Sequence, residues 1–308
     1  MISVVFPGQG SQKVGMGSDL YNQFDYVKHI FKSANDILGY NISDLILNGP
    51  QEKLNQTTFT QPAIYLIGYT IGEILKKETN FFKNKFCYLA GHSLGEYTAL
   101  TTAEAITLEQ GLLLLKNRGE AMQSAVPLGE GGMMAVLGIE TEEIKKLIDE
   151  NFENIKCFLA NDNSNGQLIL SGKNDELDKF GSLLKEKKIK NIKLPVSAPF
   201  HCELMREATI KMKKIINDQK LKDPKFKIVS NVTATAYNNT DEIKQLLIKQ
   251  IESPVRWRES IGYMISQGTN TFVEIGPGKV LSGLIKRINK EVKVLNIDKL
   301  EDIQDINL

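Results

Sequence analysis

Apolar runs of strand length alternate with stretches of helical periodicity along most of the chain. Residues 2–6 and 86–90 are short apolar runs, which predict two buried strands. The segment Thr60-Gln61-Pro62 precedes apolar residues at helical spacing, and Pro62 suits the first turn of that helix. Strands that alternate with helices favour a mainly parallel sheet covered by helices. The pattern therefore predicts an α/β fold.

The middle of the chain departs from this alternation. After the flexible stretch Gly129-Glu130-Gly131-Gly132, strands are expected at 133–137, 155–160, 167–171 and 189–196, and helices at 141–150 and 175–187. The resulting β-α-β-β-α-β order is the ferredoxin-like pattern, for which about 70 residues suffice. We therefore expect a ferredoxin-like small domain at 129–196, inserted into a larger domain formed by 1–128 and 197–308.

The first alternation resumes after the expected small domain. Helices are expected at 202–219, 241–252, 258–266 and 279–288, and strands at 226–230, 271–275 and 292–297. These elements would complete the sheet of the larger domain.

Composition limits the classes of function that the chain can have. Hydrophobic residues make up 42% of the 308 residues, enough for a sizeable core, and a net charge of +1 selects neither nucleic acid nor membrane as a partner. No apolar run reaches the roughly 18 residues of a membrane span, and the N-terminus lacks a basic leader. Three cysteines without a CxxC pair fit a reducing compartment and argue against a cysteine zinc site. We expect a cytoplasmic monomer without a bound metal.

A G-x-S-x-G motif, Gly91-His92-Ser93-Leu94-Gly95, lies between a predicted strand and a predicted helix. This context is what a nucleophile elbow requires, because a sharp turn projects the serine hydroxyl above the edge of the sheet. The free N–H groups at the start of the following helix would stabilise negative charge on an attacked carbonyl. The alternative is a tight turn whose serine only caps a helix. The strand and helix on either side favour Ser93 as a nucleophile.

A serine hydroxyl needs a base to become a strong nucleophile, and the chain has three histidines. His92 is next to Ser93, so its side chain is expected to point away from the hydroxyl, and His29 lies in a polar helical stretch. His201 follows a predicted strand end in a proline-containing loop, a usual place for catalytic groups. Elimination leaves His201 as the best base. No acid in a distinctive context completes a triad, since Asp162 and Asp175 are typical of turns or caps.

The residues alone leave two interpretations open for the loop around Gln9 and for Arg118. The glycine-rich loop around Gln9 either supplies an N–H to an oxyanion hole or is only a tight turn; Lys13 replaces the last glycine of a dinucleotide-binding fingerprint. Arg118 lies on a predicted helix, where an arginine is usually at the surface or ion-paired. In a cleft it would instead bind a carboxylate through two parallel hydrogen bonds.

Taken together, the motifs resemble those of the malonyl-CoA:acyl carrier protein transacylases of type II fatty acid synthesis. The similarity covers nearly the whole chain. The segments that carry it, in order, are Phe6-Pro7-Gly8-Gln9-Gly10-Ser11-Gln12, Thr60-Gln61-Pro62-Ala63, Gly91-His92-Ser93-Leu94-Gly95-Glu96-Tyr97, Arg118, Ala198-Pro199-Phe200-His201, Pro254-Val255-Arg256-Trp257 and Glu274-Ile275-Gly276-Pro277-Gly278.

The resemblance implies a fold and a role for each matching residue. The implied fold is an α/β-hydrolase-like core with a ferredoxin-like small domain, and the active site lies between them. Ser93 would be the nucleophile and His201 its base, held by the main-chain carbonyl of Gln250. The N–H groups of Gln9 and Leu94 would form the oxyanion hole. The substrate-binding residues implied are Arg118, which would hold the free carboxylate of malonate, together with Phe200 and His92.

The implied reaction is a ping-pong transfer from malonyl-CoA, through an ester on Ser93, to the phosphopantetheine thiol of acyl carrier protein. Coenzyme A would be a substrate, and no bound cofactor is needed. Phe200 would crowd a methyl branch and so favour malonyl over methylmalonyl. A lysine-rich stretch at 185–193 either attracts the acidic carrier protein or is only a solvated surface.

Three other functions are compatible with some of the motifs. A serine esterase or thioesterase would use water as the second acceptor, and the elbow alone does not separate it from a transferase. A non-catalytic module that binds carrier protein would not need Ser93 and His201. A transacylase domain of a polyketide assembly line would be expected to carry linkers or fused domains.

Overall fold

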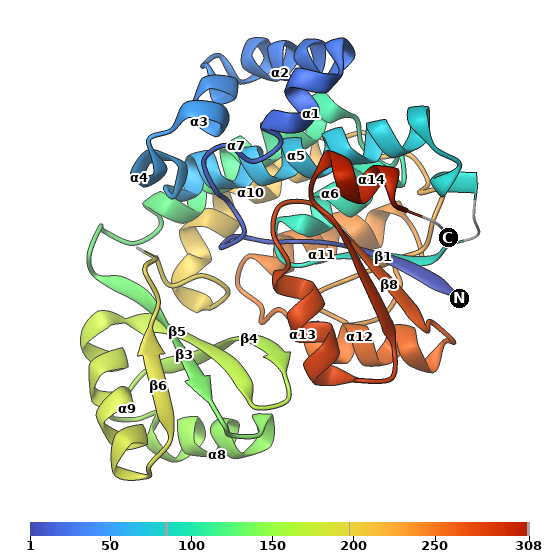
Figure 1. Cartoon of the computed structure of the whole chain (residues 1–308). Coiled ribbons are helices and arrows are strands. Elements are labelled where there is room, and N and C mark those ends of the chain that lie inside the picture. The colour runs from blue at the N-terminus through green and yellow to red at the C-terminus, as the bar shows by residue number, and fades with distance from the viewer. Residues whose placement is uncertain (84–85, 197, 307–308) are drawn as a thin grey trace.

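The larger part of the protein is built on a parallel sheet in a computed structural model that describes residues 1–83, 86–196 and 198–306. The sheet has the strand order β7-β2-β1-β8-β9, and each neighbouring pair is parallel (Figure 1). The strands are β1 (Ile2–Phe6), β2 (Phe86–Gly91), β7 (Ile228–Val229), β8 (Thr271–Ile275) and β9 (Lys293–Ile297).

Helices cover both faces of this sheet because side chains alternate between its faces. On β1, Val4 and Phe6 join one apolar core, and Val5 joins another, formed with α12 and α13. The helices of this part are α1 (Ser18–Gln23), α2 (Asp25–Leu38), α3 (Ile42–Asn48), α4 (Gln51–Leu54), α5 (Thr57–Glu78), α6 (Gly95–Thr102), α7 (Leu108–Ser124), α10 (Arg206–Asn217), α11 (Thr240–Gln250), α12 (Trp257–Ser266), α13 (Val280–Ile288) and α14 (Leu300–Gln304), with short 3₁₀ turns at Phe81–Lys83 and Glu203–Met205.

The middle of the chain forms a separate antiparallel sheet with the strand order β4-β5-β3-β6. It lies beside the parallel sheet, with α8 and α9 on its outer side (Figure 1). The elements are β3 (Gly131–Leu137), α8 (Thr141–Asn151), β4 (Cys157–Ser164), β5 (Gln167–Lys173), α9 (Asn174–Glu186) and β6 (Lys190–Lys193). The predicted β-α-β-β-α-β order and the two-part α/β fold class are confirmed.

The small sheet has two different apolar faces. One face packs on α8 and α9 and forms its own core. Met133, Ala135 and Ile169 on the other face belong to the core of the larger part. The proposed boundaries of the small domain, at residues 129 and 196, remain a prediction. Residue 197, where the larger domain is expected to resume, lies outside the described residues, as do residues 307–308.

Strand β4 is also bonded directly to the larger part. The N–H of Asp162 donates to the Val255 carbonyl at 3.0 Å, and the N–H of Val255 donates to the Ala160 carbonyl at 2.8 Å. The Asp162 carboxylate, whose side chain is 3% exposed, pairs with Arg258 at 2.7 Å. These contacts fix the small sheet against α12.

Several expected elements differ in their bounds from those observed, among them the strand expected at 155–160, which is β4 at Cys157–Ser164, and the helix expected at 202–219, which is α10 at Arg206–Asn217. Helix α5 begins at Thr57, so the placement of Pro62 in a first turn is wrong. Pro62 lies in the second turn of this largely buried helix, where it has no backbone N–H to donate to the carbonyl four residues before it. The strand expected at 189–196 ends at Lys193, because Pro195 has no N–H to extend the ladder. The strand expected at 226–230 is reduced to Ile228–Val229.

Candidate active site

The turn between β2 and α6 holds Ser93 in a left-handed backbone conformation, with φ 52°. This turn is possible only with glycine on both sides. A Cβ on Gly91 would lie 1.9 Å from the carbonyl carbon of Gly95, and a Cβ on Gly95 would lie 2.3 Å from the Phe6 oxygen. The close approach of backbone to backbone therefore requires the G-x-S-x-G pattern, and it presents the Ser93 side chain at the carboxyl edge of the sheet.

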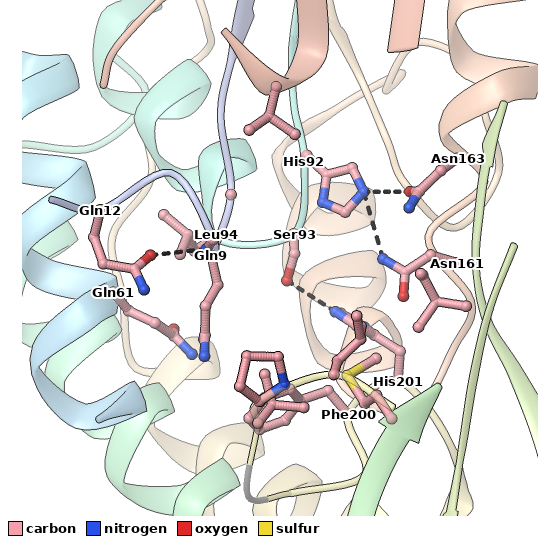
Figure 2. A pocket seen from close by; sticks show the side chains of 18 of the residues that line it. Gln9, Gln12, Gln61, His92, Ser93, Leu94, Asn161, Asn163, Phe200 and His201 are labelled. Atoms are coloured by element: carbon pink, nitrogen blue, oxygen red, sulfur yellow. Dashed lines mark hydrogen bonds between the residues drawn. The ribbon is translucent and has the colours of Figure 1, made fainter. Parts of the chain in front are cut away.

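Ser93 and His201 are brought together from positions 108 residues apart. Ser93 Oγ lies 2.8 Å from His201 Nε2, and His201 Nδ1 lies 2.8 Å from the carbonyl oxygen of Gln250 (Figure 2). A carbonyl only accepts, so Nδ1 carries the proton and Nε2 is left as an acceptor for the Ser93 hydroxyl. The Gln250 carbonyl thus lies at Nδ1 of His201, the position that an acid occupies in a triad.

The surroundings of His201 keep its imidazole neutral. The residue is 4% exposed. Burial lowers the pKa of His201 to about 3, and the nearby positive charge of Arg118 acts in the same direction. A neutral imidazole is the form that can accept a proton from a serine hydroxyl.

Arg118 lies in the same site as Ser93, on α7, and is 1% exposed. Its guanidinium donates to Gln61 Oε1 at 2.8 Å, to Gln250 Oε1 at 2.9 Å and to Ser93 Oγ at 3.0 Å. All the acceptors that the guanidinium of Arg118 has among the described residues are neutral groups. A buried guanidinium without a carboxylate partner is suited to receive a carboxylate from a ligand.

The loop after β1 packs against the elbow. A Cβ on Gly8 would lie 2.6 Å from the His92 carbonyl oxygen, so this loop needs glycine there. The Gln9 side chain donates to Thr57 Oγ1 at 3.3 Å, and the N–H of Gly10 donates to Gln12 Oε1 at 2.8 Å. Among the described residues, the backbone N–H groups of Gln9 and Leu94 donate no hydrogen bond, which leaves them available to a ligand oxygen.

A cavity of about 520 Å³ opens between the two parts of the molecule. Seven of the eight site residues expected from the sequence line it: Gln9, His92, Ser93, Leu94, Arg118, Phe200 and His201. Gln250 lies behind this surface and is fully buried. Neither of the acids considered for a triad lines the cavity, and His29 is exposed on α2.

His92 faces the small sheet rather than Ser93 (Figure 2). Its Nε2 lies 2.9 Å from Asn163 Oδ1 and 3.4 Å from Asn161 Nδ2, both on β4. Burial lowers the pKa of His92, so this imidazole is also held neutral. The two asparagines line the cavity wall opposite α5 and α7.

The comparisons with known proteins agree with this geometry. Residues 4–303 match the family described as "Acyl transferase domain". The chain is 41% identical over 305 residues to the malonyl CoA-acyl carrier protein transacylase of Bacillus subtilis (strain 168), which covers 98% of this chain and 95% of that protein. It therefore belongs to the malonyl CoA-acyl carrier protein transacylase family.

Solved structures of transacylases share the whole fold. The structure of the malonyl CoA-acyl carrier protein transacylase from Clostridium perfringens matches with a TM-score of 0.92 at 40% identity, over 98% of this chain and 95% of that one. A malonyl-transacylase solved in complex with its type II polyketide acyl-carrier protein matches with a TM-score of 0.94 at 35% identity, over 98% of this chain and 97% of that one.

Several polar residues of this transacylase site were missed by reasoning from the sequence. Asn231 accepts the Ser93 N–H at 2.7 Å and donates to the Gly91 carbonyl at 2.7 Å, so it holds both sides of the elbow. Gln61 and Glu96 lay within recognised motifs but had no assigned role. Alternation along β4 gave the available signal for the pair Asn161 and Asn163, because polar residues two apart share one face of a strand.

Proposed function

We propose that this acyltransferase moves a malonyl group from malonyl-CoA to the phosphopantetheine thiol of acyl carrier protein, and so supplies extender units for fatty acid synthesis. The observation that carries the proposal is the 2.8 Å contact between Ser93 Oγ and His201 Nε2 beside a buried guanidinium. The contact supplies a nucleophile and its base, and Arg118 supplies a partner for the free carboxylate of malonate.

In the first half-reaction, Ser93 Oγ attacks the thioester carbonyl of malonyl-CoA while its proton passes to His201 Nε2. The carbon–sulfur bond then breaks, the proton moves to the departing sulfur, and coenzyme A leaves as the thiol. The Gln250 carbonyl accepts from Nδ1–H throughout, so it keeps the imidazole in the tautomer that the step needs.

Negative charge develops on the carbonyl oxygen during this attack. We assign its stabilisation to the N–H groups of Gln9 and Leu94, which come from the loop packed against the elbow and from the start of α6. Hydrogen-bond donors that are fixed before the reaction cost no reorganisation in the transition state.

The second half-reaction reverses the first with a different thiol. His201 takes the proton of the phosphopantetheine thiol, the sulfur attacks the ester carbonyl, and the ester bond to Ser93 breaks. The proton then returns to Ser93 Oγ. Both half-reactions pass through a similar tetrahedral oxyanion, so one pair of donors serves both. The mechanism uses no bound cofactor or metal, and the coenzyme A thioester enters it as a substrate.

The choice of acyl group is assigned to Arg118 and Phe200. Arg118 touches Ser93 Oγ, which places its charge within reach of a carboxylate one methylene away from the attacked carbonyl. Phe200 is 6% exposed and lines the same cavity as His201, and we propose that its ring crowds a branch on that methylene. His92 is proposed to contact the substrate from the side of β4.

Acyl carrier protein as the partner is supported by the related malonyl-transacylase solved in complex with its own carrier protein. The lysines of the stretch 185–193 are exposed, and Lys193 pairs with Asp178, but no observation favours carrier binding there over a solvated surface. None of the helices in the described residues is long and apolar enough to cross a membrane. A cytoplasmic location and a monomeric state remain predictions.

The test is intact mass spectrometry after mixing the enzyme with malonyl-CoA. We expect a malonyl adduct on Ser93 that persists in water and is discharged by pantetheine thiols, and none in Ser93→Ala. Rapid release of free malonate without thiol would instead indicate a hydrolase. The absence of any adduct on the wild-type enzyme would refute the proposed function.

A further inference from the structure

A buried carboxylate that the mechanism does not use lies behind the active site. Glu96, in the first turn of α6, is fully buried. Its Oε2 accepts from Gln250 Nε2 at 2.7 Å and from the Asn231 N–H at 3.2 Å, and its Oε1 accepts from the Tyr237 hydroxyl. A buried carboxylate is costly unless its acceptor sites are filled, so this arrangement calls for an explanation.

The side-chain amide of Gln250 lies between Glu96 and Arg118. Its Nε2 donates to Glu96 and to the Ser93 carbonyl at 3.0 Å, and its Oε1 accepts from the Arg118 guanidinium at 2.9 Å. The reverse orientation would set the amide oxygen against a carboxylate and the amide NH₂ against a guanidinium, which only donates. The two charges together therefore permit one orientation of this amide.

We propose that Glu96 is a positioning residue, whose carboxylate fixes the Gln250 amide with its oxygen toward Arg118 and so sets the place of the guanidinium beside Ser93. The inference rests on the proposed function, because it assumes that Arg118 receives the carboxylate of malonate. Glu96 touches no reacting atom. It acts on the choice of acyl group through Gln250.

Loss of the charge on Glu96 has a specific consequence. In Glu96→Gln, the residue that faces Gln250 is an amide that both donates and accepts, so it no longer opposes the reverse orientation of Gln250, which Arg118 and the Ser93 carbonyl still disfavour. A flipped Gln250 turns its NH₂ toward Arg118 and displaces the guanidinium. Transfer of malonyl suffers from this displacement and transfer of acetyl does not, because acetyl has no carboxylate. A merely structural role would lower both rates together.

The experiment compares kcat/KM for malonyl-CoA and acetyl-CoA in the wild type and in Glu96→Gln. We expect the malonyl-to-acetyl ratio to fall roughly tenfold or more, as for the loss of a hydrogen bond to a charged group. Glu274→Gln is the matched control. Glu274 is also a fully buried carboxylate, but it accepts from the N–H groups of Leu281 and Ser282 at the start of α13, and its variant should keep the ratio.

A second measurement needs no variant and applies even if Glu96→Gln does not fold. Burial raises the pKa of Glu96 to about 7. Lowering the pH through this value therefore protonates the carboxylate and removes its charge. The titratable groups facing Glu96 are Tyr237 and Tyr97, whose pKa values are raised by burial, and Arg118; through Gln250 it meets His201, whose pKa is lowered. The pKa values of both tyrosines lie above 10 and that of His201 is about 3, so these three groups do not titrate between pH 5.5 and 8.5.

We therefore expect the malonyl-to-acetyl ratio of the wild type to fall as the pH is lowered from 8.5 to 5.5, and that of Glu96→Gln to stay constant. Titrations common to both substrates cancel in the ratio. A wild-type ratio that is independent of pH, or a Glu96→Gln variant with the wild-type ratio, would overturn the role of Glu96. Either result with normal malonyl transfer leaves the proposed function intact, because that function is tested separately by the malonyl adduct on Ser93 and its discharge by thiols.

Discussion

The guanidinium of Arg118 donates to the hydroxyl oxygen of Ser93 across 3.0 Å, although Arg118 lies on α7 and Ser93 in the turn between β2 and α6. The same oxygen lies 2.8 Å from His201 Nε2, which can accept its proton. Ser93 Oγ therefore has an acceptor on one side and a positive charge on the other before any substrate binds.

Arg118→Ala should reduce malonyl transfer far more than acetyl transfer. Truncating one partner of a buried charge pair costs about 2–5 kcal/mol, which corresponds to roughly 30-fold to several-thousand-fold in kcat/KM. The measurement is kcat/KM for both acyl-CoA substrates. Arg118→Lys keeps the charge but not the two parallel hydrogen bonds and should fall between the wild type and the alanine variant. An unchanged preference for malonyl in Arg118→Ala would contradict the assignment.

Phe200 should exclude a methyl branch next to the thioester carbonyl. Wild-type enzyme is expected to transfer malonyl in preference to methylmalonyl, and Phe200→Ala should narrow that preference by roughly tenfold or more, since one methylene in an apolar pocket discriminates by about 10- to 200-fold. Competition between the two substrates, read by mass of the Ser93 adduct, measures the effect. Phe200→Leu removes less volume and should have a smaller effect. Equal transfer of both substrates by the wild type would show that Phe200 does not select.

Because His201 is buried in its neutral form, the free energy of unfolding should decrease in acid. The pKa of His201 is lowered from its ordinary value of 6.5 to about 3, so between these values the unfolded chain binds a proton that the folded state does not. Above pH 6.5 this difference is absent, and as the pH falls below 6.5 it costs about 1.4 kcal/mol per pH unit, or about 3 kcal/mol at pH 4.5.

Urea unfolding at pH 8 and pH 4.5 tests this expectation. The decrease in unfolding free energy should be smaller in His201→Ala than in the wild type. His92 contributes in the same direction in both proteins, because its pKa is also lowered by burial, and so it cancels in the comparison. Equal decreases in the two proteins would mean that His201 takes up its proton in the same pH range in the folded state as in the unfolded chain.

Gly91→Ala should disrupt the elbow itself. The added Cβ would lie 1.9 Å from the backbone of Gly95, so either β2 or α6 must shift. We expect loss of the Ser93 adduct together with a lower melting temperature. Gly72→Ala in α5 is the control, because a Cβ there meets nothing within 4 Å and alanine favours a helix by roughly 0.5–1 kcal/mol. A Gly91→Ala enzyme that still acylates at the wild-type rate would show that the turn tolerates a side chain.

Sequence reasoning went furthest where a pattern depends on neighbours in the chain. The strands Ile2–Phe6 and Thr271–Ile275 have the predicted bounds, and the elbow lies between the strand and helix expected for it. His201 as the base followed from elimination, and its contact with Ser93 agrees. The part played by Gln250 came only from family resemblance, because nothing local marks a residue whose main-chain oxygen is used.

The polar residues behind the site were beyond such reasoning for a physical reason. Asn231 and Glu96 meet across 135 positions of sequence, and their partners are backbone groups or the side chains of other elements. Neither Asn231 nor Glu96 belongs to a sequence pattern from which its hydrogen-bond partners can be predicted. A buried glutamate in the first turn of a helix also has an ordinary explanation in the helix dipole. Their arrangement becomes visible only in three dimensions.

The backbone pairing of β4 with Val255 fixes one wall of the cavity. Together with the Asp162–Arg258 ion pair, it holds the strand that carries Asn161 and Asn163, which line the cavity, against the larger part. In the proposed ping-pong transfer, the donor thioester and the acceptor thiol react at the same Ser93 one after the other. Coenzyme A that lingers in the cavity would block the arriving prosthetic arm, so throughput depends on how quickly the first thiol departs.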